Sequence, residues 1–403
     1  MFVYKVGVAG AGTMGAQLAQ VMTYAGLPVV LSDVTMTAAQ RGVETVRRIY
    51  QSRVDKGKMT PEQLEEKMLL VTPADNFDAF QDVDLAIEAV SENMALKQQV
   101  LRDLEESCPS GAVLASNTSA LSISAMGAAT RRPGKVLGLH FFNPAYAMPL
   151  VEVIPGLATE MDTVNDMVGF VESIRKVPIM VKECAGFLVN RVLMAYLNEA
   201  VLCLQDGAGS IKQIEEDMRH FGMPVGPFTL LDSVGLDISY DVAGILYEHY
   251  GPRMTPAPLL AELVKTGRLG VKNGQGFFDY NGPNTGVVDR LVAKLHQQAN
   301  RPGTPWSSRR LLFAMVNEAV TALQEGVASA RDIDLAMVAG TGFPTEIAGP
   351  LHYADSLGID VVLRDLEEYA QTLGPRFWPA PLLRRMVAAN FTGTKVGRGF
   401  FVY

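Results

Sequence analysis

The sequence predicts an α/β fold: a doubly wound, mainly parallel sheet with an inserted helical hairpin, followed by two tandem all-α domains. In the first half of the chain, short valine-rich runs alternate with helical patterns, which is typical of parallel sheets. In the second half, strand signals are few, and "NEAVLCLQDG" at 198–207 recurs as "NEAVTALQEG" at 317–326. A recurrence of this length indicates a duplicated helical domain.

The composition excludes several classes of protein. The 403 residues are 48% hydrophobic and 19% charged, so we expect a globular protein of two or three domains. The net charge of −8 gives no general reason to bind nucleic acid. We expect no membrane span and no signal peptide, because no apolar run is long enough. Cys108, Cys184 and Cys203 lack metal-ligand spacing, which favours a reducing, cytoplasmic compartment and no metal site.

The first predicted strand, "VYKVGVA" at 3–9, leads directly into the turn "GAGTMG" and then into an apolar helical pattern. Gly10 allows a tight turn, Gly12 lets the backbone approach a pyrophosphate, and Gly15 lets the helix pack against the strand. The helix N-terminus offers N–H groups to phosphates. A glycine turn alone is weak support, but in this context we expect it, with Thr13 and Met14, to bind a dinucleotide.

The second predicted strand, "LPVVLSD", ends in Asp33. A carboxylate at this point accepts hydrogen bonds from a ribose 2′-hydroxyl and repels a 2′-phosphate. The sequence therefore predicts NAD rather than NADP. The alternative is that Asp33 is an ordinary turn residue.

A helical hairpin interrupts the alternation between Asp33 and a strand near Leu70. Its second helix has a clear start, with Thr60 as N-cap, Pro61 in the first position and Gln63 reaching back. The hairpin carries six basic residues: Arg41, Arg47, Arg48, Arg53, Lys56 and Lys58. Such a run is usually a solvated helix face, and it is also suited to hold a phosphorylated ligand.

A histidine and a glutamate lie on two of the later strands, which are predicted at 84–90, 112–116, 135–142, 150–154 and 177–181. His140 ends one strand, and Glu152 lies in the next among apolar residues, where a carboxylate needs a partner. The short connection 143–149 would bring the two side chains together. A carboxylate on one imidazole nitrogen leaves the other to take a proton. A histidine bonded to a backbone carbonyl is the alternative, and we favour proton transfer.

Six segments resemble motifs of the L-3-hydroxyacyl-CoA dehydrogenase family, in the same order and spacing over residues 3–282. They are "GAGTMG", "EAVSEN", "ASNTSALSI", "GLHFFNPAYAMPLVEVI", "GFLVNR" and "GPFTLLDSVGLD". The resemblance implies that His140 is the general base, that Glu152 orients it, that Ser119 hydrogen-bonds the substrate oxygen, and that Asn190 holds the substrate and the histidine.

The resemblance also implies binding residues. The further NAD contacts would be Glu92, Lys97, Asn117, Asn143 and Lys272, and the coenzyme A tail would lie at Arg53 and Lys56. Each has a plainer alternative: Ser119 and Asn117 could cap a turn, Asn190 could start a helix, and Lys97 could be solvated. The implied activity is an NAD-dependent (S)-3-hydroxyacyl-CoA dehydrogenase of β-oxidation or related acyl-CoA metabolism. The alternatives are an NAD-dependent dehydrogenase of a free hydroxy acid or sugar acid, and a non-catalytic NAD-binding subunit.

The recurrence sets the predicted domain limits. They are an NAD-binding domain at 1–183, a catalytic helical copy at 184–282, a linker at 283–305 and a second, structural copy at 306–403. Both copies end in the phrase "GFF" followed two residues later by tyrosine.

The copies differ where chemistry is expected, since Arg309 stands at the position of Asn190 while Lys395 matches Lys272. Single-copy family members pair through their helical domains. We therefore expect the second copy to replace a partner subunit and to cover an apolar surface of the first. The result would be a monomer with an internal pseudo-dimer, and a homo-oligomer is the alternative. The resemblance also suggests hydratase and thiolase enzymes as partners.

Overall fold

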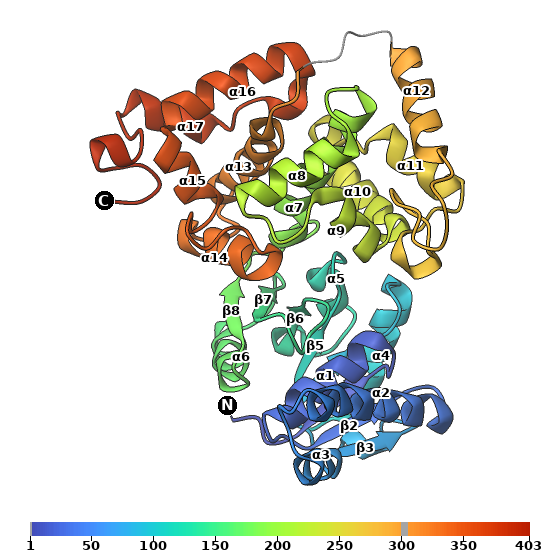
Figure 1. Cartoon of the computed structure of the whole chain (residues 1–403). Helices are drawn as coiled ribbons and strands as arrows, with labels where there is room; N and C mark the ends of the chain where they lie inside the picture. The colour runs from blue at the N-terminus through green and yellow to red at the C-terminus, as the bar shows by residue number, and fades with distance from the viewer. Residues whose placement is uncertain (1, 300–304) are drawn as a thin grey trace. The chain divides into compact units, whose positions relative to one another are not determined.

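The computed structural model describes residues 2–299 and 305–403. These residues form two compact units, which divide between Phe187 and Leu188 (Figure 1). The first unit contains the whole sheet, and the second is built from helices. The α/β fold with a helical second part is confirmed.

The first unit is built on one 8-stranded sheet in the order β3-β2-β1-β4-β5-β6-β7-β8. The strands are β1 (Val6–Ala9), β2 (Val29–Ser32), β3 (Val71–Ala74), β4 (Leu85–Glu88), β5 (Val113–Ser116), β6 (Val136–Phe141), β7 (Leu150–Pro155) and β8 (Val177–Met180). All neighbouring strands are parallel except β6 and β7. The strand order reverses between β1 and β4, and the carboxyl ends of strands at such a point form the crevice where dinucleotides bind.

Six α-helices belong to this unit: α1 (Thr13–Tyr24), α2 (Met36–Asp55), α3 (Pro61–Met68), α4 (Met94–Ser107), α5 (Ile123–Gly127) and α6 (Met161–Ser173). The predicted hairpin is formed by α2 and α3. Its second helix begins with the predicted capping box, in which Thr60 Oγ1 accepts from the Gln63 N–H and the Gln63 side chain accepts from the Thr60 N–H. Every residue of β1, β2, β4 and β5 is buried, as expected for parallel strands covered by helices on both faces.

The second unit repeats one set of helices. The first set is α7 (Val189–Gln205), α8 (Ile211–Phe221), α9 (Pro227–Val234), α10 (Leu236–Tyr250) and α11 (Pro258–Lys265). The second set is α13 (Ser308–Gln324), α14 (Ala330–Thr341), α15 (Pro350–Leu357), α16 (Ile359–Leu373) and α17 (Pro381–Ala388). The duplicated sequence therefore folds as two similar helical copies.

A further helix, α12 (Val287–Ala299), lies between the two sets. It occupies much of the segment 283–305 that the sequence analysis treats as a linker; residues 300–304 of that segment lie outside the described residues. Val288, Leu291, Val292 and Leu295 recur with helical spacing, so the segment has one apolar face, and Val288 is buried. The glycines and prolines at both ends of the segment obscured this periodicity.

The repeated chain ending is explained by a buried aspartate in each copy. In the first copy, Asp232 accepts hydrogen bonds from the backbone N–H groups of Phe277 (2.8 Å) and Phe278 (3.0 Å) and from the Tyr280 hydroxyl (3.0 Å). A Cβ on Gly276 would lie 2.0 Å from Asp232 Oδ1, so only glycine fits. Gly276, the two phenylalanines and Tyr280 thus surround the Asp232 carboxylate.

The second copy has the same arrangement around Asp355, which accepts from Phe400 N (3.0 Å), Phe401 N (3.1 Å) and the Tyr403 hydroxyl (3.0 Å). A Cβ on Gly399 would lie 1.9 Å from the carboxylate. Burial raises the pKa of Asp232 in the first copy and that of Asp355 in the second. The phrase recurs because each copy needs it to satisfy a buried acceptor.

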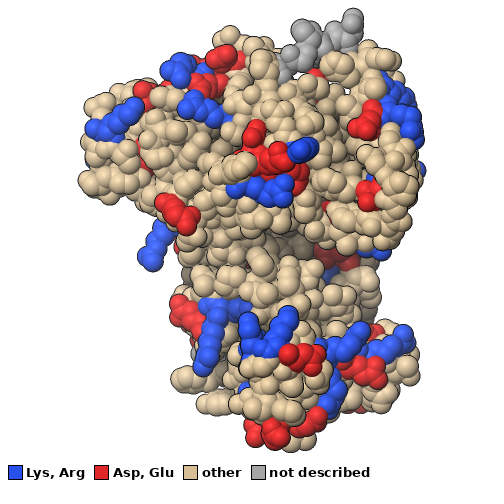
Figure 2. Space-filling model, in the orientation of Figure 1, with Lys and Arg blue, Asp and Glu red and all other residues tan. Residues whose placement is uncertain are grey.

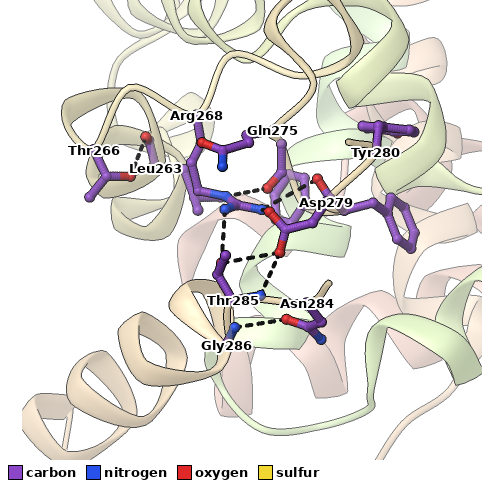
Figure 3. Close-up of polar contacts among 12 residues, drawn as sticks. Leu263, Thr266, Arg268, Gln275, Asp279, Tyr280, Asn284, Thr285 and Gly286 are labelled. Atoms are coloured by element: carbon purple, nitrogen blue, oxygen red, sulfur yellow. Dashed lines mark hydrogen bonds and ion pairs between the residues drawn. The ribbon is translucent and has the colours of Figure 1, made fainter. Parts of the chain in front are cut away.

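The first copy has an additional ion pair near its end, between Arg268 and Asp279 (Figure 3). The buried Arg268 donates from Nε to the Gly276 carbonyl (2.6 Å) and pairs through Nη2 with Asp279 Oδ1 (2.8 Å). Asp279 Oδ2 in turn accepts from the N–H of Thr285 (2.8 Å). In the second copy Phe391 and Val402 stand at the positions of Arg268 and Asp279, so this ion pair belongs to the first copy.

The two copies pack against each other through α7 and α13, with reciprocal ion pairs at the centre. Arg191 of α7 pairs with Glu318 of α13 (2.6 Å), and Arg310 of α13 pairs with Glu199 of α7 (2.5 Å). All four residues are buried. The expected cover of apolar surface is thus only part of the interface, because charged pairs occupy its centre.

The same reciprocity holds at the edge of this interface. A Cβ on Gly222 would lie 2.8 Å from Pro344, and a Cβ on Gly342 would lie 2.6 Å from Pro224. Gly222 and Gly342 end equivalent helices with left-handed backbone angles. The copies are therefore related by an approximate two-fold arrangement like that of a symmetric dimer.

Candidate active site

The glycine turn joins β1 to α1, and each glycine has the surroundings that its predicted role requires. Gly10 has a φ of +102°, and a Cβ on Gly15 would lie 1.7 Å from the Gly10 carbonyl oxygen, so α1 can pack this closely only with glycine there. A Cβ on Gly12 would meet nothing within 4 Å, which leaves room for a ligand beside the backbone. Gly12 is also the N-cap of α1, no side chain caps it, and Thr13 and Met14 form the first helical positions.

Asp33 directly follows β2 and lies beside this turn. Its Oδ2 accepts a hydrogen bond from the Ala11 N–H (2.8 Å), and its Oδ1 accepts from the Val34 N–H (2.8 Å). Each carboxylate oxygen has a second lone pair for a ribose hydroxyl. The open Gly12, the uncapped helix N-terminus and this carboxylate fit a dinucleotide without a 2′-phosphate, and these residues would hold NAD.

His140 and Glu152 meet as predicted. They are direct register partners on the antiparallel strands β6 and β7, and His140 Nδ1 lies 2.6 Å from Glu152 Oε2. Glu152 is fully buried and His140 nearly so. The rings of Phe142 and Phe187 lie 4.4 and 5.8 Å from the imidazole, centroid to centroid. Since β6 is parallel to β5, His140 lies near the same edge of the sheet as the glycine turn.

The segment 116–119, which carries Ser119, is held by side chains from neighbouring strands and helices. Asn117 Oδ1 accepts from the Phe141 N–H (2.9 Å), which ties the segment to β6 beside His140. Thr118 Oγ1 donates to Glu92 Oε1 (2.5 Å), and the Ser119 N–H donates to the same oxygen (3.1 Å). Both Asn117 and Glu92 therefore have structural contacts in addition to their predicted roles at the cofactor.

Lys97 is a buried lysine and not a solvated one. Its Nζ donates to Glu88 Oε1 (2.8 Å) and to the Val90 carbonyl (3.1 Å), and it lies 3.2 Å from Glu92 Oε2. Glu88 is fully buried and was missed by the sequence analysis. A glutamate between Ile87 and Ala89 in an apolar strand carries the same signal that identified Glu152, so it could have been found.

The remaining predicted residues lie in varied surroundings. Asn143 Oδ1 accepts from Gln17 Nε2 (3.0 Å) of α1, close to the glycine turn in sequence. In the second unit, Asn190 lies at the start of α7, and Lys272 Nζ lies 2.5 Å from Asp237 Oδ1. Arg309, in the position of Asn190, pairs with Asp365 (2.9 Å).

The basic hairpin has partners of its own. Arg47 pairs with Glu65 of α3 through its two terminal nitrogens, Nη1 and Nη2. Arg53 donates to the Tyr24 hydroxyl (3.0 Å), and its guanidinium lies 4.6 Å from the centre of that ring. Lys56 caps the end of α2 and is exposed. On the face drawn in Figure 2, Lys and Arg side chains are interspersed with Asp and Glu, so the basic residues do not form one uniform patch there.

Residues 2–299 and 305–403 contain neither a candidate group of metal ligands nor a candidate membrane-spanning helix. No three His, Cys, Asp or Glu side chains among them are grouped so that they could hold a metal ion. None of the described helices has the length and apolar character that crossing a bilayer requires.

A dinucleotide crevice with a histidine–carboxylate pair at the same edge of the sheet defines a nicotinamide-dependent dehydrogenase. The chain belongs to the 3-hydroxyacyl-CoA dehydrogenase family. The NAD-binding domain of this family matches residues 5–184, and its C-terminal domain matches twice, at 186–280 and 307–403. The predicted family and the predicted cofactor, NAD, are thereby confirmed.

Three similar proteins illustrate the relationship. A fatty acid oxidation complex subunit alpha of Shewanella sp. (strain MR-7) is 37% identical over 397 residues, which cover 96% of this chain and 56% of that protein. The chain thus spans about half the length of the curated relatives it matches. The crystal structure of 3-hydroxybutyryl-CoA dehydrogenase from Escherichia coli K12 has a TM-score of 0.88 and 30% identity, covering 96% of this chain and 99% of that one. An (S)-3-hydroxybutyryl-CoA dehydrogenase from Ralstonia eutropha has a TM-score of 0.68 and 36% identity, covering 70% of this chain and 100% of that one.

Proposed function

We propose that this protein is an NAD-dependent (S)-3-hydroxyacyl-CoA dehydrogenase, which interconverts 3-hydroxyacyl-CoA and 3-oxoacyl-CoA in fatty-acid or related acyl-CoA metabolism. The observation that carries the proposal is the buried His140–Glu152 pair at the edge of the sheet where the glycine turn and Asp33 lie. Family membership supports the acyl-CoA substrate.

His140 acts as the general base for the 3-hydroxyl group. Its Nδ1 faces Glu152, so Nε2 is the nitrogen that takes the proton, and the buried carboxylate stabilises the imidazolium that forms. Glu152 also fixes the orientation of the ring, because the two residues are register partners on paired strands. The nicotinamide, when bound, supplies the hydride chemistry at the substrate C3.

Ser119 and Asn190 polarise the substrate oxygen as the carbonyl develops. Ser119 suits this role because Asn117, Thr118 and Glu92 fix the backbone around it. Glu92, Lys97, Asn143 and Lys272 complete the cofactor site, and Arg53 with Lys56 holds the coenzyme A tail. These assignments follow the family motifs in this sequence.

The test is NADH oxidation with acetoacetyl-CoA, compared between the native chain and His140→Gln. We expect kcat to fall roughly 10²- to 10⁴-fold while NADH still binds, since the glycine turn is unaffected. His352→Gln is a matched control, because His352 Nδ1 lies 2.6 Å from Asp334 in the second helical copy. Turnover that survives in His140→Gln would contradict the mechanism. A native chain that binds NADH but reduces no acyl-CoA would favour the non-catalytic subunit.

The free-acid dehydrogenase is distinguished by the hairpin. In Arg53→Glu/Lys56→Glu, the KM for acetoacetyl-CoA should rise because the 3′-phosphate and pyrophosphate of coenzyme A would be repelled. Activity with a free hydroxy acid that exceeds activity with acyl-CoA, and that does not change in this variant, would favour the alternative.

We also propose that the chain is monomeric, with the two helical copies as an internal pseudo-dimer. The reciprocal Arg–Glu pairs and Gly–Pro contacts support this, because each copy already occupies the surface through which identical subunits would pair. Light scattering that shows a dimer built through α7 and α13 would contradict it.

The relatives named as subunits of a complex support hydratase and thiolase partners, which co-purification tests. Three free thiols support a reducing, cytoplasmic location.

A further inference from the structure

Glu88 lies at the centre of the sheet, where the strand order reverses. It is the last residue of β4, between Ala9 of β1 and Ser116 of β5 in the register. Its side chain is fully buried, and a buried carboxylate is costly unless donors surround it. Three donors do: the Val90 N–H (2.7 Å) and Lys97 Nζ (2.8 Å) on Oε1, and Ser116 Oγ (2.7 Å) on Oε2.

Lys97 is held by this arrangement. An ammonium group has three donors, and Lys97 has three acceptors around it: Glu88, the Val90 carbonyl and Glu92. The side chain is 1% exposed, whereas the Glu92 side chain is 43% exposed. Lys97 thus makes two hydrogen bonds, to Glu88 and the Val90 carbonyl, and one ion pair, to Glu92. Glu88 is its buried counter-ion, and Glu92 is the partner that faces solvent.

The contacts continue from Glu92 to the backbone at Ser119. Glu92 Oε1 accepts from Thr118 Oγ1 (2.5 Å) and from the Ser119 N–H (3.1 Å). Ser116, bonded to Glu88, also accepts from the Thr118 N–H (3.2 Å). Glu88 thus reaches the segment 116–119 by two routes, one through Lys97 and Glu92 and one through Ser116.

We propose that Glu88 is a positioning residue of this site: it holds Lys97 and Glu92, and through them and Ser116 it fixes the backbone at Ser119. The proposal rests on the function proposed above, in which Ser119 bonds the substrate oxygen. Lys97, which we place at the cofactor site, also serves the site by holding Glu92.

Glu88→Gln in the full chain tests this proposal. The amide keeps the size of the side chain but removes the charge that balances Lys97, so Lys97 should draw Glu92 away from Thr118 and Ser119. We expect hydrogen exchange of the segment 117–121 to accelerate roughly tenfold or more. We also expect kcat with acetoacetyl-CoA at saturating NADH to fall roughly tenfold.

Glu105→Gln is the matched control. Like Glu88, Glu105 is a buried glutamate, but it lies on α4 and is bonded to Arg131 and Arg132, away from the segment 116–119. It should lower the melting temperature but leave exchange at 117–121 and kcat unchanged. A merely structural role for Glu88 would make the two variants alike.

The outcomes are separable. Unchanged exchange at 117–121 in Glu88→Gln would overturn the proposal, whether or not the Kd for NADH, measured by fluorescence, changes. If Glu88→Gln does not fold, Glu88→Asp keeps the charge but withdraws the carboxylate from Lys97 and Ser116, and the same two measurements decide. If the native chain reduces no acyl-CoA, the proposed function fails, while the exchange measurement still tests Glu88.

Discussion

The two helical copies of the second unit share their buried contacts but differ in their chemistry. Both copies hold a buried aspartate under the same glycine-aromatic ending, and both supply an arginine and a glutamate to the shared interface. Only the first copy has Asn190 and the Arg268–Asp279 pair. The residues that hold the buried ending and the interface are thus present in both copies, whereas Asn190, for which we propose a role in the reaction, is present only in the first.

The largest effect is expected when the shared interface is broken. Arg310→Met leaves Glu199 buried with only Arg376 as a partner, and it should lower the free energy of unfolding by about 3 to 5 kcal/mol. Arg191→Met should cost a similar amount, because Arg191 and Glu318 make the reciprocal pair. Urea denaturation of both variants measures the losses. If the two variants lose very different amounts of unfolding free energy, the reciprocal ion pairs do not stabilise the interface equally.

The next effect separates the copies in catalysis. Asn190→Ala should lower kcat with acetoacetyl-CoA by roughly 10²-fold, as expected for a lost donor to the developing oxyanion. Arg309→Ala, the same position in the second copy, should leave kcat unchanged, and it serves as the control. Equal losses in both variants would assign the effect to stability and remove the proposed role of Asn190.

The Arg268–Asp279 ion pair of the first copy can be replaced by the residues at the same positions of the second copy, Phe391 and Val402. Arg268→Phe and Asp279→Val each leave one partner buried without its counter-charge, whereas the double variant introduces the pair that the second copy uses. We expect each single variant to be less stable than the double variant by about 1 to 2 kcal/mol. Strictly additive losses in thermal denaturation would show that the pair does not act as a unit.

The comparison can also be sharpened by the titration of Asp334, a buried aspartate of the second copy. Burial raises the pKa of Asp334 to about 6, although its bond to His352 opposes the shift. The folded state therefore holds this proton more tightly than the unfolded state, and the stability that results is lost as the pH rises through about 6.

Asp334→Asn removes this titration. Relative to that variant, the native chain should lose on the order of 1 to 3 kcal/mol of unfolding free energy between about pH 4 and pH 6. Urea denaturation at several pH values measures the difference. The same slope in both proteins would assign the pH dependence to other groups.

The sequence predicted the elements that depend on local patterns. All strands of the sheet, the hairpin with its capping box at Thr60, and the meeting of His140 with Glu152 follow from periodicity, caps and a short connection. The Rossmann-type order of strands follows from their alternation with helices.

What the sequence did not predict depends on partners far apart in the chain. Arg191 and Glu318 are separated by 127 positions, and neither residue shows locally that it will be buried opposite the other. Lys97 was predicted to contact NAD, with a solvated lysine as the alternative; its burial against Glu88 was not predicted, because that counter-ion lies on another element. The helix α12 was hidden by flanking glycines and prolines, which are stronger local signals than a short apolar face.

The reciprocal contacts between the copies have a consequence for how this protein can evolve. In a symmetric pair of identical chains, one codon change alters both contacts across the axis at once. Here Gly222 with Pro344 and Gly342 with Pro224 are encoded separately, so a change at one contact leaves the other intact. Compensatory substitutions can therefore accumulate one contact at a time, and covariation between the two halves of the gene should follow these pairs.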